Sequence, residues 1–337
     1  MNKPRITIAD VAEKANVSKM TVSRVLNNKG EISEATREKI LRVMDELGYR
    51  PNKIARSLVT NTTLRIGIAV PSLANPYFGA IIEGAENVFW EHGYHILLGH
   101  SNGKADREAA VMEMFEDHRV DGVIVLSAPS SVEDMERYLR NHRAAVVINT
   151  FVNPGIAGRI YTDEIKSMAL AVHQILKNGR RQIGYVSYGT GTYADHERYR
   201  GFGLALEQAG LPFDADSQFR ACEDPDAGMI NVIEDLLRTN PQIDGLVCFN
   251  TGIAARALQA CERLGRRVPD DLALVGYDDS VLAELAIPPL TTLDLSIPKQ
   301  EVGAIAARML LARMEDETLE QEDVILQHQL IIRASAP

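Results

Sequence analysis

The 337-residue sequence predicts an all-α head followed by an α/β body of two lobes, each built on a doubly wound parallel sheet. Three observations predict this class. Apolar residues recur at helical spacing in three short segments between residues 7 and 47. From Leu64 onward, short runs rich in valine and isoleucine alternate with helical segments, the pattern of parallel strands covered on both faces. Parts of this second region repeat at a nearly constant interval, which indicates two similar lobes.

Each of the three head helices has residues suited to its ends. Serine and threonine are good amino-terminal caps, whereas glycine and asparagine accept the left-handed backbone that ends a helix. The capping and terminating residues, in chain order, are Thr7, Asn16, Ser18, Ser33 and Gly48. The turn at Asn16 is short, so the first two helices form a compact pair.

The second of these helices, residues 19–27, has one apolar and one polar face at about 100° per residue. Val22, Val25 and Leu26 share the apolar face. The opposite face holds Met20, Ser23, Arg24 and Asn27, with Lys19 and Thr21 at its edges. Two helices around a tight turn, packed on a third, form a helix-turn-helix, whose second helix reads base edges in the major groove. The alternative is a three-helix protein-binding module with a hydrophilic face.

The charge distribution favours DNA. Residues 1–62 contain 12 Lys and Arg against 7 Asp and Glu, a net charge of +5, whereas the whole chain carries −10. The remainder therefore carries −15. A basic head on an acidic body indicates that only the head approaches a polyanion.

Residues 51–61 join the head to the body. Pro51 suits the first turn of a helix, and Ile54, Ala55 and Leu58 make a short apolar face. A helix of this length is not stable alone in water, so it would fold only with support from both sides. The alternative is an ordinary linker with a helical turn.

The head resembles the lactose-repressor (LacI/GalR) family of bacterial transcription regulators over residues 9–61. The motifs that carry the resemblance are Ile8-Ala9-Asp10-Val11-Ala12, Asn16-Val17-Ser18, Thr21-Val22-Ser23-Arg24-Val25-Leu26-Asn27, Thr36-Arg37 and Leu47-Gly48-Tyr49-Arg50-Pro51-Asn52. The resemblance implies that Lys19, Met20 and Arg24 contact bases. It implies phosphate contacts by Thr7, Ser18, Tyr49 and Asn52, and a hinge helix that places Ala55 and Leu58 in the minor groove.

The body shows an internal repeat. Gly67 and Gly184 lie 117 residues apart, as do Gly93 and Gly210, and similar Asp-Gly pairs precede residues 123 and 246. The predicted strands are Arg65–Val70, His95–Leu98, Val123–Leu126, Val146–Ile148, Ile183–Val186, Leu246–Phe249 and Leu272–Val275. Two such lobes with a cleft between them resemble periplasmic sugar-binding proteins.

On that resemblance the chain crosses between the lobes near Tyr161–Glu164, Thr292–Ser296 and Ile325–Gln329. The predicted organisation is a helix-turn-helix domain at 1–50, a hinge at 51–61, and an effector-binding and dimerisation domain at 62–337. Within this domain, lobe 1 spans about 62–162 plus 296–324, and lobe 2 spans about 163–292 plus 325–337.

The predicted ligand site lies beyond the carboxyl ends of the strands, where open α/β sheets bind ligands. Loops there are rich in Tyr, Phe, Asn and Asp, which suit a polyhydroxylated ligand. The family resemblance assigns effector contacts to Tyr77, Phe78, Arg198, Asn250 and Asp278. The other predicted contacts are Asn75, Asn149 and Glu223.

Three positions depart from the family pattern. Thr251 and Asn149 stand where the family has aspartate, and Glu223 stands where an aromatic residue often covers the ligand. Losing two carboxylates would ease binding of a sugar acid or sugar phosphate, whereas an inward Glu223 would oppose it. The sequence therefore leaves a sugar, a sugar acid and a sugar phosphate open.

Enzyme signatures are missing from the sequence, which contains no phosphate-binding Gly-x-x-x-x-Gly-Lys, no Gly-x-Ser-x-Gly and no His-Glu-x-x-His. Cys222, Cys248 and Cys261 have no paired spacing and are expected to be small buried thiols. No cofactor, metal or membrane segment is expected, and residues 1–10 do not form a signal peptide, so we expect a cytoplasmic, nucleoid-associated protein.

We therefore expect a homodimeric, effector-controlled transcription regulator, a repressor in most such proteins, bound to palindromic operator DNA. Two alternatives share the cleft: a transporter's solute-binding protein and a sugar-processing enzyme.

Overall fold

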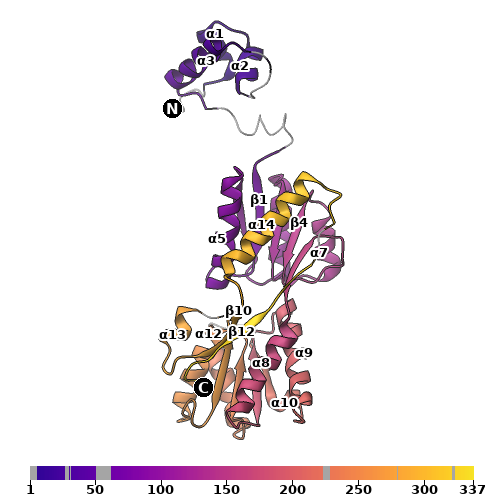
Figure 1. The fold of residues 1–337 in the computed structure, drawn as a ribbon, viewed down its shortest axis with the longest axis vertical. Coiled ribbons are helices and arrows are strands. Elements are labelled where there is room, and N and C mark those ends of the chain that lie inside the picture. Colours follow the sequence, from indigo (N-terminus) through magenta and orange to yellow (C-terminus); the bar gives the residue numbers. More distant parts are fainter. Residues whose placement is uncertain are drawn as a thin grey trace. The chain divides into compact units, whose positions relative to one another are not determined.

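The computed structural model describes residues 6–26, 30, 32–50, 62–222, 228–278, 280–320 and 323–337. It forms two compact units, Met1–Thr63 and Leu64–Pro337 (Figure 1). Five predicted contact residues, Asn27, Asn52, Ala55, Leu58 and Glu223, lie outside the described residues. None of the described helices is long and apolar enough to cross a membrane.

The head contains the three predicted helices, α1 (Ile8–Ala15), α2 (Lys19–Leu26) and α3 (Glu34–Leu47). Their apolar faces meet in one core, in which Val11, Val22 and Ile40 are fully buried. The predicted ends are confirmed: Ser18 and Ser33 accept hydrogen bonds from backbone N–H groups of the first turns of α2 and α3. Asn16 and Gly48 have positive φ angles of 51° and 62°.

Lobe 1 is a six-stranded parallel sheet in the order β2-β1-β3-β4-β5-β11. Its strands are β1 (Arg65–Val70), β2 (His95–His100), β3 (Gly122–Leu126), β4 (Ala145–Ile148), β5 (Gly158–Thr162) and β11 (Val324–Leu326). Its helices are α5 (Pro76–Glu91), α6 (Ala105–Asp117), α7 (Val132–Leu139) and α14 (Lys299–Glu315). Separate apolar clusters fill the two faces of the sheet, which explains why its central strands are apolar throughout.

Lobe 2 repeats this design with the sheet order β7-β6-β8-β9-β10-β12. Its strands are β6 (Ile183–Ser187), β7 (Phe219–Ala221), β8 (Gly245–Cys248), β9 (Ala273–Tyr277), β10 (Thr291–Leu295) and β12 (His328–Ile331). Its helices are α8 (Glu164–Lys177), α9 (Tyr193–Gln208), α10 (Ala215–Gln218), α11 (Met229–Thr239), α12 (Thr251–Arg263) and α13 (Val281–Leu285). All strand pairs are parallel except β10 with β12.

The internal repeat extends to single side chains. Gly122 begins β3 and Gly245 begins β8, at the same place in each sheet. The aspartate before each glycine accepts backbone hydrogen bonds from the residues ahead of the neighbouring strand: Asp121 from Leu64 at 2.7 Å, and Asp244 from Gln182 at 2.8 Å. The fold class predicted from the sequence, including the two similar lobes, is confirmed.

All the predicted strands are present, with ends that differ by at most two residues. The unpredicted strands are β5, β7, β10, β11 and β12. They lie at or next to the edges of the sheets, where a strand is covered on fewer sides. Four of these sequences mix polar and apolar residues, as in Gly158-Arg159-Ile160-Tyr161-Thr162, and lack the continuous apolar run of a central strand. The fifth, β11, is apolar but only three residues long.

The chain passes between the two sheets three times: from β5 to α8, from β10 to α14, and from β11 to β12. In Figure 1 the last of these is the yellow segment that runs from lobe 1 into β12. The first two passages lead directly into helices whose amino ends face the boundary between the lobes. The same boundary receives the carboxyl ends of the strands that precede the predicted ligand loops.

Helices α5 and α14 lie side by side across the lobe 1 sheet (Figure 1). They approach so closely that a Cβ atom on Gly84 would lie 1.8 Å from the backbone oxygen of Gln300. A Cβ atom on Gly303 would lie 1.8 Å from the backbone oxygen of Ile81. Helix α5 begins at the predicted ligand loop, and α14 begins where the chain passes between the sheets for the second time. Their close packing therefore fixes the positions of these two segments relative to each other.

Candidate functional site

The exposed face of α2 carries the residues predicted to read bases. Met20 is 66% exposed, although it is a large apolar side chain, and Lys19 and Arg24 are exposed as well. Val22 and Val25, on the other side of the helix, are buried in the head core. Ser23 is half-buried at the edge of the face. The structure therefore leaves a polar helix face open, with donors of the kind that bind base edges.

Two of the predicted phosphate contacts stand at helix amino ends. Thr7 precedes α1, and its backbone N–H and hydroxyl both donate to the Asp10 carboxylate, which lowers the pKa of Asp10. Ser18 precedes α2 and accepts a 3.0 Å hydrogen bond from the Thr21 N–H. Amino ends of helices present backbone N–H groups and a positive dipole, which suits a phosphate. The third, Tyr49, packs against the head core, and burial raises its pKa.

The body has left-handed backbone at three strand ends on the boundary between the lobes. Ser127 follows β3, Asn149 follows β4 and Asp278 follows β9, with φ angles of 47°, 47° and 59°. Such a conformation is unfavourable for a residue with a Cβ atom, and it persists only where the surrounding structure enforces it. These turns aim the predicted contacts Asn149 and Asp278 at fixed positions.

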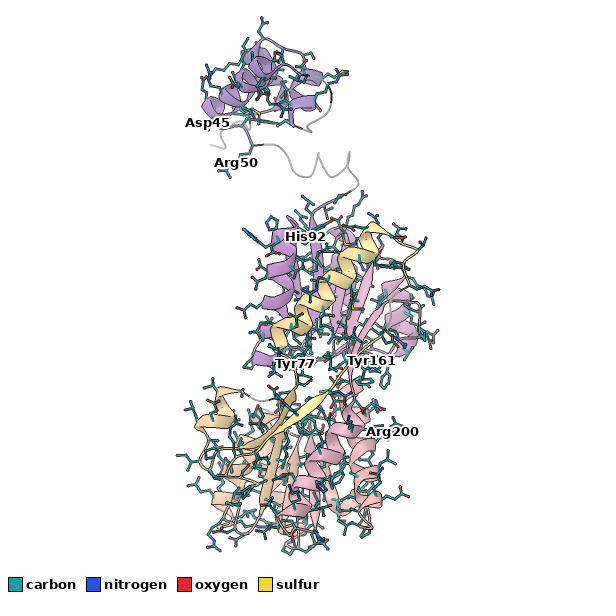
Figure 2. The ribbon with its side chains drawn as sticks, in the orientation of Figure 1. Asp45, Arg50, Tyr77, His92, Tyr161 and Arg200 are labelled. Atoms are coloured by element: carbon teal, nitrogen blue, oxygen red, sulfur yellow. The ribbon has the colours of Figure 1, made fainter. Side chains whose placement is uncertain are left out.

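Tyr77 and Phe78 are the aromatic side chains that lobe 1 contributes to the predicted site. Asn75 caps α5 by accepting a 3.0 Å hydrogen bond from the Tyr77 N–H. The two aromatic rings are buried and pack edge to face, with centroids 5.3 Å apart. Figure 2 shows Tyr77 at the end of lobe 1 that faces lobe 2, on the same level as Tyr161. The amino end of α5 therefore presents a rigid aromatic pair to the boundary.

Arg198, on α9, is a predicted contact whose side chain is almost fully buried, with only 4% exposed. Its Nε donates to Glu164 at 2.8 Å and its Nη2 to the second oxygen of the same carboxylate at 3.1 Å. Its Nη1 donates to the backbone oxygen of Phe249 at 2.6 Å. The guanidinium also lies over the rings of Phe249 and Tyr277, at 4.5 and 4.0 Å from their centroids.

Electrostatic coupling links Arg198, Asp278 and Tyr77. Burial raises the pKa of Asp278 to about 6; Arg198 opposes this rise and Glu164 adds to it. Burial also raises the pKa of Tyr77, and the Asp278 and Glu164 carboxylates raise it further. A side chain of lobe 1 therefore shares one electrostatic environment with side chains of lobe 2. The structure brings together these three predicted contacts.

The asparagines predicted as ligand contacts form hydrogen bonds within the loops that follow the strands. Asn149 is 4% exposed and accepts hydrogen bonds from the N–H and the hydroxyl of Thr162. Asn250 caps α12 by accepting a bond from the Ile253 N–H, and its amide donates to the Tyr188 hydroxyl at 3.1 Å. The amide oxygens of Asn75, Asn149 and Asn250 thus stabilise the backbone at the boundary of the lobes.

Thr251, one of the departures from the family pattern, has a comparable role. Its hydroxyl donates to the backbone oxygen of Asp278 at 2.7 Å and accepts from Ser280 at 3.3 Å. An aspartate at position 251 would face that backbone oxygen with a second acceptor. Threonine instead ties the Asp278 loop to the start of α12.

Glu164 is a partner of the predicted contact Arg198 that sequence reasoning missed. It stands in the first turn of α8, fully buried, and its partner Arg198 is 34 residues away. No local pattern marks such a residue. The one available signal is a glutamate that follows an N-cap directly where the chain enters lobe 2.

The cysteines are buried and not linked to one another. Burial raises the pKa of Cys261 to about 11, and that of Cys248 well above its usual range, so both are protonated and unreactive. Among the described residues, no group of three or more histidine, cysteine, aspartate and glutamate side chains could hold a metal ion.

Comparisons with known proteins agree with both units. The sequence model described as "Bacterial regulatory proteins, lacI family" matches residues 7–52, and that of the "Periplasmic binding protein-like domain" matches residues 172–336. The transcriptional regulator RegA of Clostridium saccharobutylicum is 32% identical over 334 residues, with 98% of each chain covered. The transcriptional repressor PurR of Vibrio parahaemolyticus is 32% identical, with 97% of each chain covered.

Among solved structures, the complex of the transcriptional regulator CelR with cellobiose is 28% identical with a TM-score of 0.73, covering 98% of this chain and 100% of that one. These relatives are regulators and not enzymes, which excludes the sugar-processing alternative, and they share the head that a solute-binding protein lacks. The chain belongs to the lacI family of bacterial regulatory proteins and is a DNA-binding transcriptional repressor of that family.

Proposed function

We propose that this repressor is a homodimer that binds a palindromic operator and is controlled by a polyhydroxylated small molecule bound between its lobes. The observation that carries the proposal is the electrostatic coupling of the buried Tyr77 and Arg198 with the half-buried Asp278, which draws on both lobes. A ligand that contacts both lobes is able to favour one arrangement of them over another.

In the DNA-binding half of this proposal, α2 lies in the major groove. Lys19, Met20 and Arg24 contact base edges, with Ser23 beside them, because these residues lie on the face of α2 away from the buried valines. The sequence pattern adds Asn27 to the same set of base-edge contacts. Thr7, Ser18, Tyr49 and Asn52 contact phosphates. Ala55 and Leu58 of the hinge enter the minor groove at the operator centre, where apolar side chains open a base step.

In the effector half, Tyr77 and Phe78 cover the apolar face of the ligand, while Arg198 and Asp278 pair with its hydroxyl groups. Asn75, Asn149 and Asn250 belong to the same proposed site, and the sequence assigns Glu223 to it as well. The relative bound to cellobiose supports a sugar or a related compound as the class of ligand. Aromatic faces and a few fixed polar groups are the usual means of binding such molecules.

Exposed apolar side chains support a homodimer. Val281 and Leu285 on α13 are 69% and 73% exposed, and Ile287 in the following loop is 91% exposed. A cluster of this kind on one surface of a protein usually marks a contact with another chain. We propose that the same surface of a second copy covers it, because a twofold axis also places two recognition helices on the two half-sites of a palindrome.

Control follows from linkage between the lobes and the heads. The effector changes the angle between the lobes, and with it the spacing of the two segments that lead to the heads. Its influence on DNA affinity is no larger than its difference in affinity for the two lobe arrangements. The repressor meets DNA and effector together in the cytoplasm.

The test begins with selection of a binding sequence for the full chain from random duplexes, which we expect to be palindromic. Fluorescence anisotropy then measures operator affinity with and without candidate sugars. At least one sugar should change the affinity of the intact protein by about 5–150-fold, the usual range of such coupling. Arg198→Ala should abolish this response and leave affinity without sugar within about threefold. A full response in Arg198→Ala would remove Arg198 from the effector site.

A further inference from the structure

The guanidinium of Arg198 already has a carboxylate partner within the protein. Glu164 binds it through both oxygens, at 2.8 and 3.1 Å, and the two side chains are 0% and 4% exposed. Paired, two-point contacts of this kind are strong and directional. The carboxylate occupies the position that an anionic group of a ligand would need in order to neutralise Arg198.

The surrounding charges leave negative charge in excess. The cations that act on Asp278 are Arg198 and Lys299, and the carboxylates are Glu164 and Asp294. Lys299 lies 2.5 Å from Asp294, so that pair is also neutralised internally. Among the residues that the structure describes, two cations therefore face three carboxylates, and Arg198 and Lys299 each pair with a carboxylate other than Asp278.

Two features of its position favour the charged form of Glu164. It lies in the first turn of α8, where the helix dipole favours a negative charge, and Arg198 neutralises it directly. Burial opposes ionisation and raises the pKa of Glu164, while Arg198 lowers it. A buried pair of opposite charges with two hydrogen bonds is stable as a unit, whereas one partner alone is costly to bury.

We propose that Glu164 determines effector specificity: by occupying Arg198 it restricts the cleft to polyhydroxylated molecules without a negative charge, that is, neutral sugars and amino sugars. The inference rests on the proposed effector site and narrows it. It excludes the sugar acids and sugar phosphates that the sequence left open. An ammonium group on the ligand would be well placed beside Asp278, whereas a carboxylate or phosphate would face two acidic side chains, the buried Glu164 and the half-buried Asp278.

The first experiment uses the intact wild-type protein and matched ligand sets. Each set is one ring in four forms, for example glucose, glucosamine, glucuronate and glucose 6-phosphate, with equivalent sets for galactose and ribose. Calorimetric titration gives affinities, and anisotropy gives the effect on operator binding. For any ring that binds, the anionic forms should bind roughly a hundredfold more weakly than the neutral form, because like charges brought together without water repel strongly.

The second experiment removes the negative charge that neutralises Arg198. Glu164→Gln retains an oxygen that accepts from Arg198 but removes the negative charge, so inorganic phosphate should raise the unfolding midpoint of this variant by roughly a few degrees and leave the wild type unchanged. Glu197→Gln is the matched control, since Glu197 pairs on the same helix with Arg200, which is 59% exposed. It should behave as the wild type does. Should Glu164→Gln fail to fold, the wild-type ligand sets decide alone.

The outcomes separate this inference from the proposed function. An acid or phosphate form that binds the wild type as tightly as the neutral sugar, and changes operator affinity, overturns the exclusion of anions but leaves the proposed effector site in place. A folded Glu164→Gln that gains no affinity for phosphate or for any anionic form overturns the role of Glu164. If no form in any set binds or changes operator affinity, the proposed function itself fails.

Discussion

The hydroxyl of Tyr193, at the start of α9 in lobe 2, donates a 3.2 Å hydrogen bond to the backbone oxygen of Thr162, the last residue of β5 in lobe 1. The ring of Tyr193 also packs against Phe151 and Tyr161 of lobe 1, at centroid distances of 4.8 and 6.0 Å. This contact spans the first passage of the chain between the lobes. It is therefore placed to stabilise the arrangement of the lobes seen in the structure.

Tyr193→Phe keeps the aromatic packing and removes only the hydrogen bond. The free energy of unfolding should fall by about 0.5–1.5 kcal/mol, the net contribution of one hydrogen bond. The ratio of operator affinities with and without effector should change several-fold if a change of lobe angle breaks this bond, because the bond joins the two lobes. Tyr138→Phe is a control, since the half-buried Tyr138 hydroxyl accepts a 3.3 Å hydrogen bond from Arg137 of the same helix, α7, within lobe 1. An unaltered affinity ratio in Tyr193→Phe would show that this contact does not distinguish the two arrangements.

The close approach of α5 to α14 predicts opposite effects for two alanine substitutions on α5. At Gly84 the new methyl group would lie 1.8 Å from a backbone oxygen of α14, so Gly84→Ala should cost about 3 kcal/mol or more. Gly79 has open space around a Cβ atom, and Gly79→Ala should stabilise the protein by about 0.5–1 kcal/mol through helix propensity. Urea denaturation measures both. Equal effects at the two positions would contradict the packing.

The raised pKa of Asp278 should make the stability of the protein depend on pH. Burial raises its pKa from the ordinary 3.8 to about 6, so the folded protein binds this proton more tightly than the unfolded chain does. The associated stabilisation is present in full below pH 3.8 and is lost as the pH rises through about 6. Because the residue is half-buried, we expect a loss of about 1–3 kcal/mol.

The measurement compares urea denaturation of the wild type and Asp278→Asn at several pH values from 5 to 7.5. Stability of the wild type relative to the variant should decrease as pH increases, since asparagine does not titrate. A difference that stays constant over this range would mean that Asp278 titrates at an ordinary pKa, and that the cleft does not carry the excess negative charge described above.

We expect α2 to recognise the operator sequence through a base contact of Arg24. Arg24→Ala should weaken operator binding by about 1–3 kcal/mol and relax the preference for the base it contacts. Arg42, exposed on α3, supplies a control that loses the same charge. Arg42→Ala should weaken binding to operator and to random DNA alike, if at all. Uniform weakening by Arg24→Ala across both kinds of DNA would identify a phosphate contact in place of base reading.

Much of the architecture is present in local sequence. The capping serines, Asn16 and Gly48 define the head helices because the rules for helix ends act within a few residues. The central strands are recognisable because both of their faces are buried, which requires a continuous apolar run. Edge strands escape this reasoning, since β12 mixes polar and apolar residues and β11 is an apolar run of only three residues.

The boundary between the lobes is a different case. The sequence by itself determined which loops reach the boundary of the lobes, and which aromatic and polar residues those loops carry, because strand ends and repeats are periodic features of the chain. Only the tertiary structure decided that Glu164 neutralises Arg198, that Thr251 holds the Asp278 backbone, and that Tyr77 shares their electrostatic environment. These contacts join the ends of separate elements, and their distances depend on how whole helices and sheets pack together, which no short stretch of sequence encodes.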